Sequence, residues 1–205
     1  PLAHLAWFRD TEPELWKRAN YIAMNDTFVY KELCDKLVVD PSKATTFYLR
    51  DQTSGTWNKD LLEFLSISES ALPKLVPSGT DVGALRAAIA EKTGLSTDTR
   101  IVTGSFDHPS AARSTGVFEP GDLLISAGTS WVAFAPIESR ETALSIGALI
   151  DPFLSGNGPN GSWGAMLSLT AVAEKIDRLL ADLFNSNSDL YRAFDEAAMK
   201  APAGA

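Results

Sequence analysis

An aspartate and a turn of small residues are the features of this sequence best suited to chemistry. Asp107 follows Gly104-Ser105-Phe106 after a short apolar stretch, and the turn Gly128-Thr129-Ser130 stands further along the chain. A carboxylate can accept the proton of a substrate hydroxyl, and the backbone N–H groups of such a turn can bind phosphate oxygens. A general base and a phosphate-binding turn are together the least that an enzyme needs to transfer a phosphoryl group to a small alcohol.

The residues around Asp107 place it at the start of a helix. A short strand over 100–103 precedes it, and Pro109 suits the first turn of a helix. The ordinary interpretation is a helix N-cap, a position that aspartate commonly fills. An N-cap role and a general-base role are compatible, because the N-terminus of a helix favours the anionic carboxylate. His108 could hydrogen-bond a substrate hydroxyl or simply cover the helix start.

Two glycine-containing segments are candidates for binding a nucleotide. Gly128-Thr129-Ser130 joins two predicted strands, so it can be an ordinary hairpin turn as well as a phosphate site. Residues 156–161 match the G-x-G-x-x-G pattern of dinucleotide-binding proteins. Pro159 removes an N–H group from that segment, and the flanking sequence lacks the other elements of a Rossmann half. We interpret 156–161 as a loop, with an NAD(P)-dependent oxidoreductase as the weaker alternative.

Local signals predict helices in the first half of the chain and a sheet in the second. The first half is predicted to hold helices over 12–21, from 25 to a stop at Asp40-Pro41, over 58–65 and over 82–92, with an extended segment at 44–49. In these helices Leu15 is expected in the core, Asn58 as an N-cap and Gly94 as the residue that closes the last one. The second half is predicted to hold strands over 100–103, 123–127, 131–135 and 145–154, and helices over 107–114, 162–184 and 189–200. The predicted fold class is α/β.

Composition and charge limit the class of protein. The chain has 205 residues, of which 45% are hydrophobic and 21% charged, as is typical of a soluble globular protein. The formal net charge of -8, with Lys and Arg dispersed, argues against nucleic acid as a partner. A single cysteine, Cys34, excludes an internal disulfide, and no apolar run reaches the length of a membrane span. We expect a cytoplasmic protein with no nucleic-acid or membrane partner.

The order of the motifs resembles the FGGY family of carbohydrate kinases, which includes xylulokinase, fuculokinase and glycerol kinase. The similarity begins at Leu5-Ala6-Trp7-Phe8, is most specific at Gly104-Ser105-Phe106-Asp107 and at 120–130, and thins after about Phe134. Segments similar to the family also lie at 12–14, 24–26, 40–44, 57–58, 72–75, 82–83 and 93–95.

The resemblance implies an actin-like ATPase, or ribonuclease H-like, fold with parts of two domains. Residues 1–119 would be the C-terminal part of the N-terminal, sugar-binding domain, and 120–205 the first part of the C-terminal, nucleotide-binding domain. By the same resemblance Asp107 is the catalytic base and contacts the substrate, His108 binds the substrate, and Gly128-Thr129-Ser130 binds phosphate of the nucleotide. The implied cofactors are ATP and Mg²⁺. The implied partners are a small sugar or polyol and, in a homodimer, a second copy of the chain.

The sequence departs from the family pattern at several positions. His4 stands where the family signature usually has Lys, and Thr11 replaces a larger polar residue; an Asp-x-Gly-Thr phosphate loop and the later glycine-rich adenosine motif are not found. We therefore expect an internal fragment, inactive alone, of a kinase that phosphorylates a hydroxyl of a small sugar or polyol. The alternative is a non-catalytic binding or regulatory protein with the same fold. The sequence leaves open which sugar is used and whether it contacts Asp10, Asp40, Trp57 or Asp151.

Overall fold

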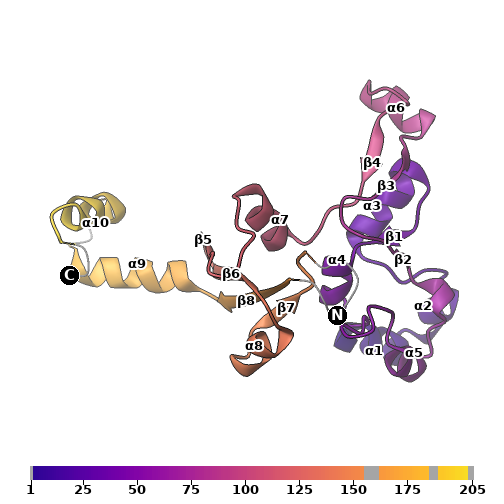
Figure 1. The fold of residues 1–205 in the computed structure, drawn as a ribbon, viewed down its shortest axis with the longest axis horizontal. Coiled ribbons are helices and arrows are strands. Elements are labelled where there is room, and N and C mark those ends of the chain that lie inside the picture. Colours follow the sequence, from indigo (N-terminus) through magenta and orange to yellow (C-terminus); the bar gives the residue numbers. More distant parts are fainter. Residues whose placement is uncertain (1, 155–161, 185–188, 203–205) are drawn as a thin grey trace.

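A computed structural model describes residues 2–154, 162–184 and 189–202. Its first half consists mainly of short helices, and its second half is a sheet from which two helices extend (Figure 1). The helical elements of the first half are α1 (Leu2–Thr11), α2 (Pro13–Arg18), α3 (Asn25–Cys34), α4 (Pro41–Thr46), α5 (Lys59–Leu65), the 3-10 turn η1 (Glu69–Ala71) and α6 (Ala87–Thr93). The α/β class predicted from the sequence is confirmed.

The core of the first half surrounds Trp57, whose indole N–H donates to the Pro73 carbonyl over 3.2 Å. The buried side chains packed together there are Val39, Ala44, Phe47, Leu49, Trp57, Leu62, Leu65, Ile67 and Leu72. A short parallel pair, β1 (Val38–Val39) and β2 (Lys74–Leu75), joins two edges of this core. Burying such side chains stabilises the fold by roughly 1.5–3 kcal/mol each, so this core holds α4 and α5 in fixed positions.

Helix α4 corrects two predictions. Asp40 and Pro41 open this helix instead of ending the preceding one, and the segment predicted to be extended over 44–49 begins inside this helix and continues as a turn. The Asp40 side chain accepts hydrogen bonds from the N–H groups of Ser42 and Lys43. An aspartate that satisfies these N–H groups, followed by proline in the first turn, starts a helix as readily as an Asp-Pro pair can end one.

Helices α2 and α3 are shorter than predicted. Helix α2 ends at Arg18, and Leu15, which the pattern placed in the core, is 52% exposed. Helix α3 ends at Cys34, where the next residue, Asp35, adopts a left-handed conformation with φ of 58°. The Cys34 side chain is buried.

Two further helix boundaries of the first half were predictable from local signals. Asn58 caps α5 with its side chain, as expected. The predicted helix over 82–92 begins later, because β3 (Asp81–Ala84) pairs with β4 (Arg100–Val102) before α6 starts. Gly94 ends α6 in the left-handed region with φ of 75°, as expected of a C-terminal glycine.

The second half is built on a four-stranded antiparallel sheet with the strand order β5-β6-β8-β7. Its strands are β5 (Leu124–Ala127), β6 (Trp131–Ile137), β7 (Leu149–Asp151) and β8 (Trp163–Leu169). The hairpin predicted around Gly128-Thr129-Ser130 is confirmed. The strand predicted over 145–154 is the shorter β7.

Two short helices pack on this sheet. Helix α7 (Asp107–Ser114), predicted with the same bounds, packs Ala112 against Phe134 and Phe153. Helix α8 (Arg140–Ser145), which the sequence did not predict, contributes to a second small cluster. The buried residues of that cluster are Ala143, Ala148 and Ala165.

The prediction of one long helix from residue 162 was wrong. Strand β8 occupies the first part of that segment and pairs with β6 along its whole length. Helix α9 (Val172–Leu183) starts after Ala171, which is left-handed with φ of 55°. A Cβ at Gly164 of β8 would collide with the Phe134 ring, so glycine permits the close packing of the strand against this core.

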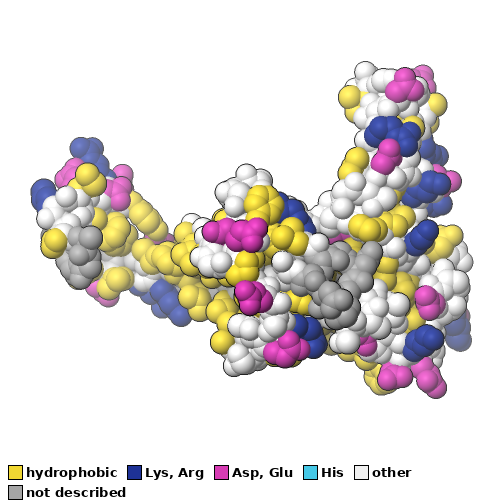
Figure 2. Space-filling view, viewed as in Figure 1, with side chains coloured by type: hydrophobic (Ala, Val, Ile, Leu, Met, Phe, Trp, Pro, Cys, Tyr) yellow, Lys and Arg dark blue, Asp and Glu magenta, His cyan; other side chains and the backbone are white. Residues whose placement is uncertain are grey.

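Helices α9 and α10 (Leu190–Ala198) extend away from the sheet (Figure 1). Asp189 caps α10, close to the predicted start. Apolar side chains of both helices face solvent, and Figure 2 shows hydrophobic side chains along α9 where it leaves the sheet. Among the described residues, no helix has the length and apolar character needed to cross a membrane.

Candidate functional site

Asp107 is the first residue of α7, and its side chain is exposed. Phe106, not Asp107, is the N-cap, so the expectation that Asp107 caps the helix was wrong. One carboxylate oxygen, Oδ1, accepts from the N–H of His108 over 2.8 Å. The other has no hydrogen bond among the described residues and can accept one from a ligand. The N-terminal end of α7 favours a negative charge at this position.

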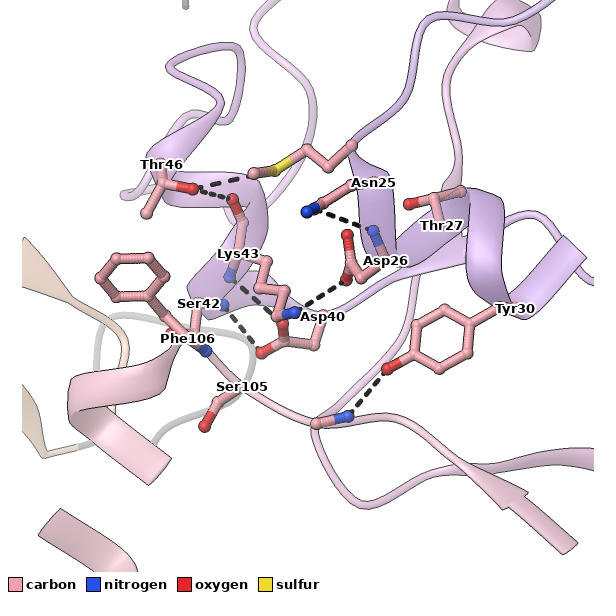
Figure 3. A network of polar contacts seen from close by, with 12 residues as sticks. Asn25, Asp26, Thr27, Tyr30, Asp40, Ser42, Lys43, Thr46, Ser105 and Phe106 are labelled. Carbon is pink, nitrogen blue, oxygen red and sulfur yellow. Dashed lines mark hydrogen bonds and ion pairs between the residues drawn. The ribbon is translucent and has the colours of Figure 1, made fainter. Parts of the chain in front are cut away.

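Side chains from two distant helices hold the segment that precedes Asp107. The Gly104 N–H donates to the hydroxyl of Tyr30 on α3 over 3.0 Å, and the Phe106 N–H donates to the hydroxyl of Ser42 on α4 over 3.2 Å. Figure 3 shows Tyr30 and Ser42 beside the segment that carries Ser105 and Phe106. The Ser42 hydroxyl in turn donates to Oδ2 of Asp151, at the end of β7. These bonds fix the backbone from which the Asp107 side chain projects.

Arg113, in the last turn of α7, ties the same helix to the sheet region. Its guanidinium donates to the Ser105 hydroxyl and to the Phe153 carbonyl. The guanidinium also lies over the Phe153 ring, 4.7 Å from its centroid. Ser105 and Ser110 share a further hydrogen bond of 2.7 Å between their hydroxyls. The start of α7 is therefore held by contacts from α3, α4 and the end of the sheet.

The start of α4 is itself held by charged side chains. Asp40 is 1% exposed and accepts from the N–H groups of Ser42 and Lys43 and, over 2.6 Å, from the Ser78 hydroxyl. Burial raises the pKa of the Asp40 carboxyl, and the hydrogen bond from Ser78 opposes this rise. The Lys43 ammonium lies 3.4 Å from a carboxylate oxygen of Asp26, from α3 (Figure 3). This network sets the position of Ser42.

His108 is half-buried at the second position of α7. Its ring contacts Phe106 edge to face, with the centroids 6.1 Å apart. The ring nitrogens make no hydrogen bond to the described residues. His108 is therefore placed beside Asp107, with donor and acceptor capacity left for a ligand.

The turn Gly128-Thr129-Ser130 is held by the strands that it joins. The Gly128 N–H donates to the Ser130 carbonyl over 3.2 Å, so this group does not point freely to a ligand. The Thr129 carbonyl accepts from the N–H of Ala173 at the start of α9, also over 3.2 Å. The N–H groups of Thr129 and Ser130 make no hydrogen bond within the described part of the chain. The exposed turn therefore offers two N–H groups and two hydroxyls.

The two candidate segments are held at different points along β6. No hydrogen bond between described residues links Asp107 or His108 to residues 128–130. Helix α7 packs on Phe134 inside β6, whereas the turn lies beyond Trp131 at the end of that strand. Residues 156–161, the glycine-rich segment considered as a dinucleotide site, lie outside the described residues. Within the described ranges, no three His, Cys, Asp or Glu side chains gather as a metal site.

Reasoning from the sequence missed the residues that position Asp107. Tyr30 and Ser42 lie 74 and 64 residues before the N–H groups that they bind, and no local pattern indicates such contacts. The only signal for Ser42 was its place in the family-like segment 40–44. Arg113 was likewise not singled out, because an arginine in a last helical turn is common.

Comparison with known proteins gives a consistent result. Residues 1–113 match the model of the N-terminal domain of the FGGY family of carbohydrate kinases. The chain is 30% identical to the xylulose kinase of Bacillus subtilis over 140 residues, which are 68% of this chain and 28% of that protein. It is 26% identical to the autoinducer-2 kinase of Yersinia enterocolitica over 212 residues, covering 100% of this chain and 39% of that protein.

Solved structures match along the whole chain. The structure of xylulose kinase from Rhodospirillum rubrum superposes with a TM-score of 0.83, at 24% sequence identity, over 99% of this chain and 41% of that one. At this identity the similarity establishes the fold. The chain spans only 25% to 39% of the length of the curated relatives that it matches.

Proposed function

Because this chain belongs to the FGGY family of carbohydrate kinases, we propose that it carries the acceptor side of an ATP-dependent kinase for a small sugar or polyol. Asp107 takes the proton of the acceptor hydroxyl as the general base. The observation that carries this assignment is the exposed Asp107 carboxylate, whose supporting backbone is held by Tyr30 and Ser42. General-base assistance of this kind accelerates a reaction roughly 10²–10⁴-fold.

The neighbouring groups have separate roles in this proposal. His108 binds a substrate hydroxyl next to the one that reacts. Gly128-Thr129-Ser130 binds phosphate of ATP through the N–H groups of Thr129 and Ser130. The Gly128 N–H does not take part, because it donates to the Ser130 carbonyl. Mg²⁺ enters with the nucleotide phosphates and needs few protein ligands, which is compatible with a described chain that contains no metal cluster of its own.

The domain organisation is part of the same proposal. Residues 1–119 form the C-terminal part of a sugar-binding domain, and 120–205 begin a nucleotide-binding domain of an actin-like ATPase fold. The family match over 1–113 and the start of the sheet at β5 support a boundary near residue 119. Closure of two such domains over substrate would exclude water and limit hydrolysis of ATP. The functional unit is proposed to be a homodimer.

The proposal is tested by ADP release from the protein expressed from its complete gene. ATP and Mg²⁺ are supplied with a panel of ketopentoses, deoxyhexuloses, tetritols, gluconate and glycerol. Turnover is expected on one acceptor, and Asp107→Asn should reduce kcat at least about 100-fold while ATP still binds. Asp98→Asn, an exposed aspartate in a turn, is the matched control and should keep normal turnover. Normal turnover of Asp107→Asn would exclude its role, and ATP binding without any turnover would favour the non-catalytic alternative.

A further inference from the structure

Asp151, at the end of β7, is a buried carboxylate that the proposed reaction does not use. Its side chain is 6% exposed, and among the described residues only the Ser42 hydroxyl donates a hydrogen bond to it, at Oδ2. Taking a charged group out of water is unfavourable unless the group is well paired. Natural proteins keep such unfavourable groups mainly where they serve a function. The single donor to Asp151 belongs to the other half of the molecule, which indicates what that function is.

Hydrogen bonds from the first half hold the chain on both sides of Asp151. Before it, the Ile150 carbonyl accepts from the side-chain amide of Gln52 over 3.1 Å. After it, the Phe153 carbonyl accepts from the guanidinium of Arg113 on α7. Figure 1 shows β7 beside α4, the helix that carries the donor to Asp151. The carboxylate of Asp151 is therefore presented to the first half at a defined position.

The Ser42 hydroxyl joins this carboxylate to the backbone before Asp107. A hydroxyl has one proton to donate and two lone pairs that accept. Burial raises the pKa of Asp151 only to about 6, so at neutral pH the carboxylate is mainly ionised and can only accept. It takes the Ser42 proton, and a lone pair of the hydroxyl accepts from the Phe106 N–H over 3.2 Å. Asp151 therefore fixes the rotation of the hydroxyl that holds Phe106.

Phe106 determines where the first turn of α7 lies. It is the N-cap of this helix and directly precedes Asp107. Its carbonyl accepts from the Ser110 N–H over 3.0 Å, so a shift of Phe106 moves the helix start with it. A displacement of about 1 Å in a reacting group can lower a rate roughly 100-fold. The chain of hydrogen bonds thus runs from the segment before the proposed base to the sheet of the second half.

We propose that Asp151 is a positioning residue through which the second half of the molecule sets the place of the catalytic base: it orients the Ser42 hydroxyl, which holds the backbone before Asp107. Hydrogen bonds in a chain strengthen one another, and a charged acceptor at the end strengthens the bond that it receives. The inference rests on the proposed function of Asp107. It goes further, because it makes the base depend on a residue of the half proposed to bind the nucleotide.

Steady-state kinetics of the protein from its complete gene test this role. Asp151→Ala, which removes the acceptor of the Ser42 proton, should lower kcat roughly tenfold and change KM for the sugar and for ATP less than about twofold, because the base is displaced while binding is kept. Asp151→Asn keeps an oxygen that can accept this proton and should retain most of the turnover. Asp182→Ala, at an exposed position of α9, is the matched control and should keep normal kcat.

A double-mutant comparison separates positioning from a general loss of stability. If Asp151 acts through Ser42, Asp151→Ala should change kcat by less than about twofold in a Ser42→Ala background, because both substitutions break the same chain. Hydrogen exchange of the Phe106 N–H should also be faster in Asp151→Ala than in the natural protein. Asp151→Val, which keeps a branched side chain without an acceptor, replaces Asp151→Ala in both measurements if the latter does not fold.

The outcomes distinguish this inference from the proposed function. Normal kcat in Asp151→Ala, while Asp107→Asn has lost its turnover, would overturn the inference alone. Effects of Asp151→Ala and Ser42→Ala that simply multiply, or unchanged exchange of the Phe106 N–H, would overturn it as well. Normal turnover in Asp107→Asn would overturn the proposed function, and the positioning role would fall with it.

Discussion

The two segments proposed to act on substrate and nucleotide are held in different ways. The N–H groups of Gly104 and Phe106, before Asp107, donate to the side chains of Tyr30 and Ser42 from two other helices. Arg113 of α7 itself donates to the Ser105 hydroxyl. The turn 128–130 is fixed by the hairpin that it closes and by one backbone bond from Ala173. A general base needs a position that does not change during reaction, whereas a phosphate turn needs accessible N–H groups. Side chains from other helices give Asp107 a fixed position, and the local geometry of the hairpin leaves N–H groups of the turn accessible.

The largest effect is expected at Asp151, which links the sheet to Ser42. Burial raises the pKa of Asp151 from 3.8 to about 6, so between these values the folded state binds more protons than the unfolded state. The stability contribution is present in full below pH 3.8 and is lost as pH rises through about 6, at a cost of about 3 kcal/mol. Relative to the natural chain, Asp151→Asn should therefore gain about 3 kcal/mol in free energy of unfolding between pH 4 and pH 7.

Denaturant unfolding of both proteins at several pH values measures this difference directly. Asparagine keeps an oxygen that accepts from the Ser42 hydroxyl, so the link to α4 is retained. Asp98→Asn, in an exposed turn, is the matched control for the substitution itself. A difference that stays constant with pH would mean that Asp151 is not a buried titrating group.

Ser42→Ala is expected to have the next largest effect, because it removes partners from both the Phe106 N–H and Asp151. Leaving these groups unsatisfied should lower the free energy of unfolding by about 2 kcal/mol. In the protein from the complete gene, kcat should fall roughly tenfold or more with little change in substrate KM, because the displaced Asp107 reacts poorly. Ser42→Thr, which keeps the hydroxyl, should restore most of the activity. An unchanged kcat in Ser42→Ala would show that α4 does not position Asp107.

Tyr30→Phe tests the support of the backbone before Asp107 by removing a single hydrogen bond, so its effect on stability is smaller than that of Ser42→Ala. It removes only the hydroxyl that accepts from Gly104, while the ring stays in place. The expected loss is about 1 kcal/mol of unfolding free energy, the typical net value of one hydrogen bond. Thermal unfolding measures it, with Tyr21→Phe as the matched control, since Tyr21 is an exposed tyrosine of the same half. Equal effects of the two substitutions would contradict a specific role for Tyr30.

Thr129→Ala should have the smallest effect on stability, within about 0.5 kcal/mol, because the structural bond of Thr129 uses its carbonyl and not its side chain. If the turn binds phosphate, KM for ATP should rise while KM for the acceptor stays constant. A loss of stability as large as that of Ser42→Ala would show that the turn also depends on side-chain contacts. In that case the turn 128–130 would not be held by its hairpin backbone alone, and it would not differ in this respect from the segment before Asp107.

The elements that local patterns described well are those whose partners lie nearby in sequence. The hairpin around 128–130, helix α7 and the cap at Asn58 were predicted, because turn and capping residues act over a few positions. The segment from 162 was misassigned, because its apolar spacing fits a helix as well as a strand. The segment forms a strand because β8 pairs with β6 and because Gly164 leaves space for the Phe134 ring.

The sequence by itself determined the family, the α/β class, Asp107 at the start of a helix and the small-residue turn, since these depend on residue type and short spacing. Only the tertiary structure decided that Tyr30 and Ser42 hold the backbone before Asp107 and that Arg50 and Asp151 line the same cleft. Arg50 and Asp151 stand far apart in the sequence, and neither lies in a pattern that indicates the other. Their proximity arises from the packing of the helical half against the sheet, because hydrophobic burial brings together side chains that no local spacing relates.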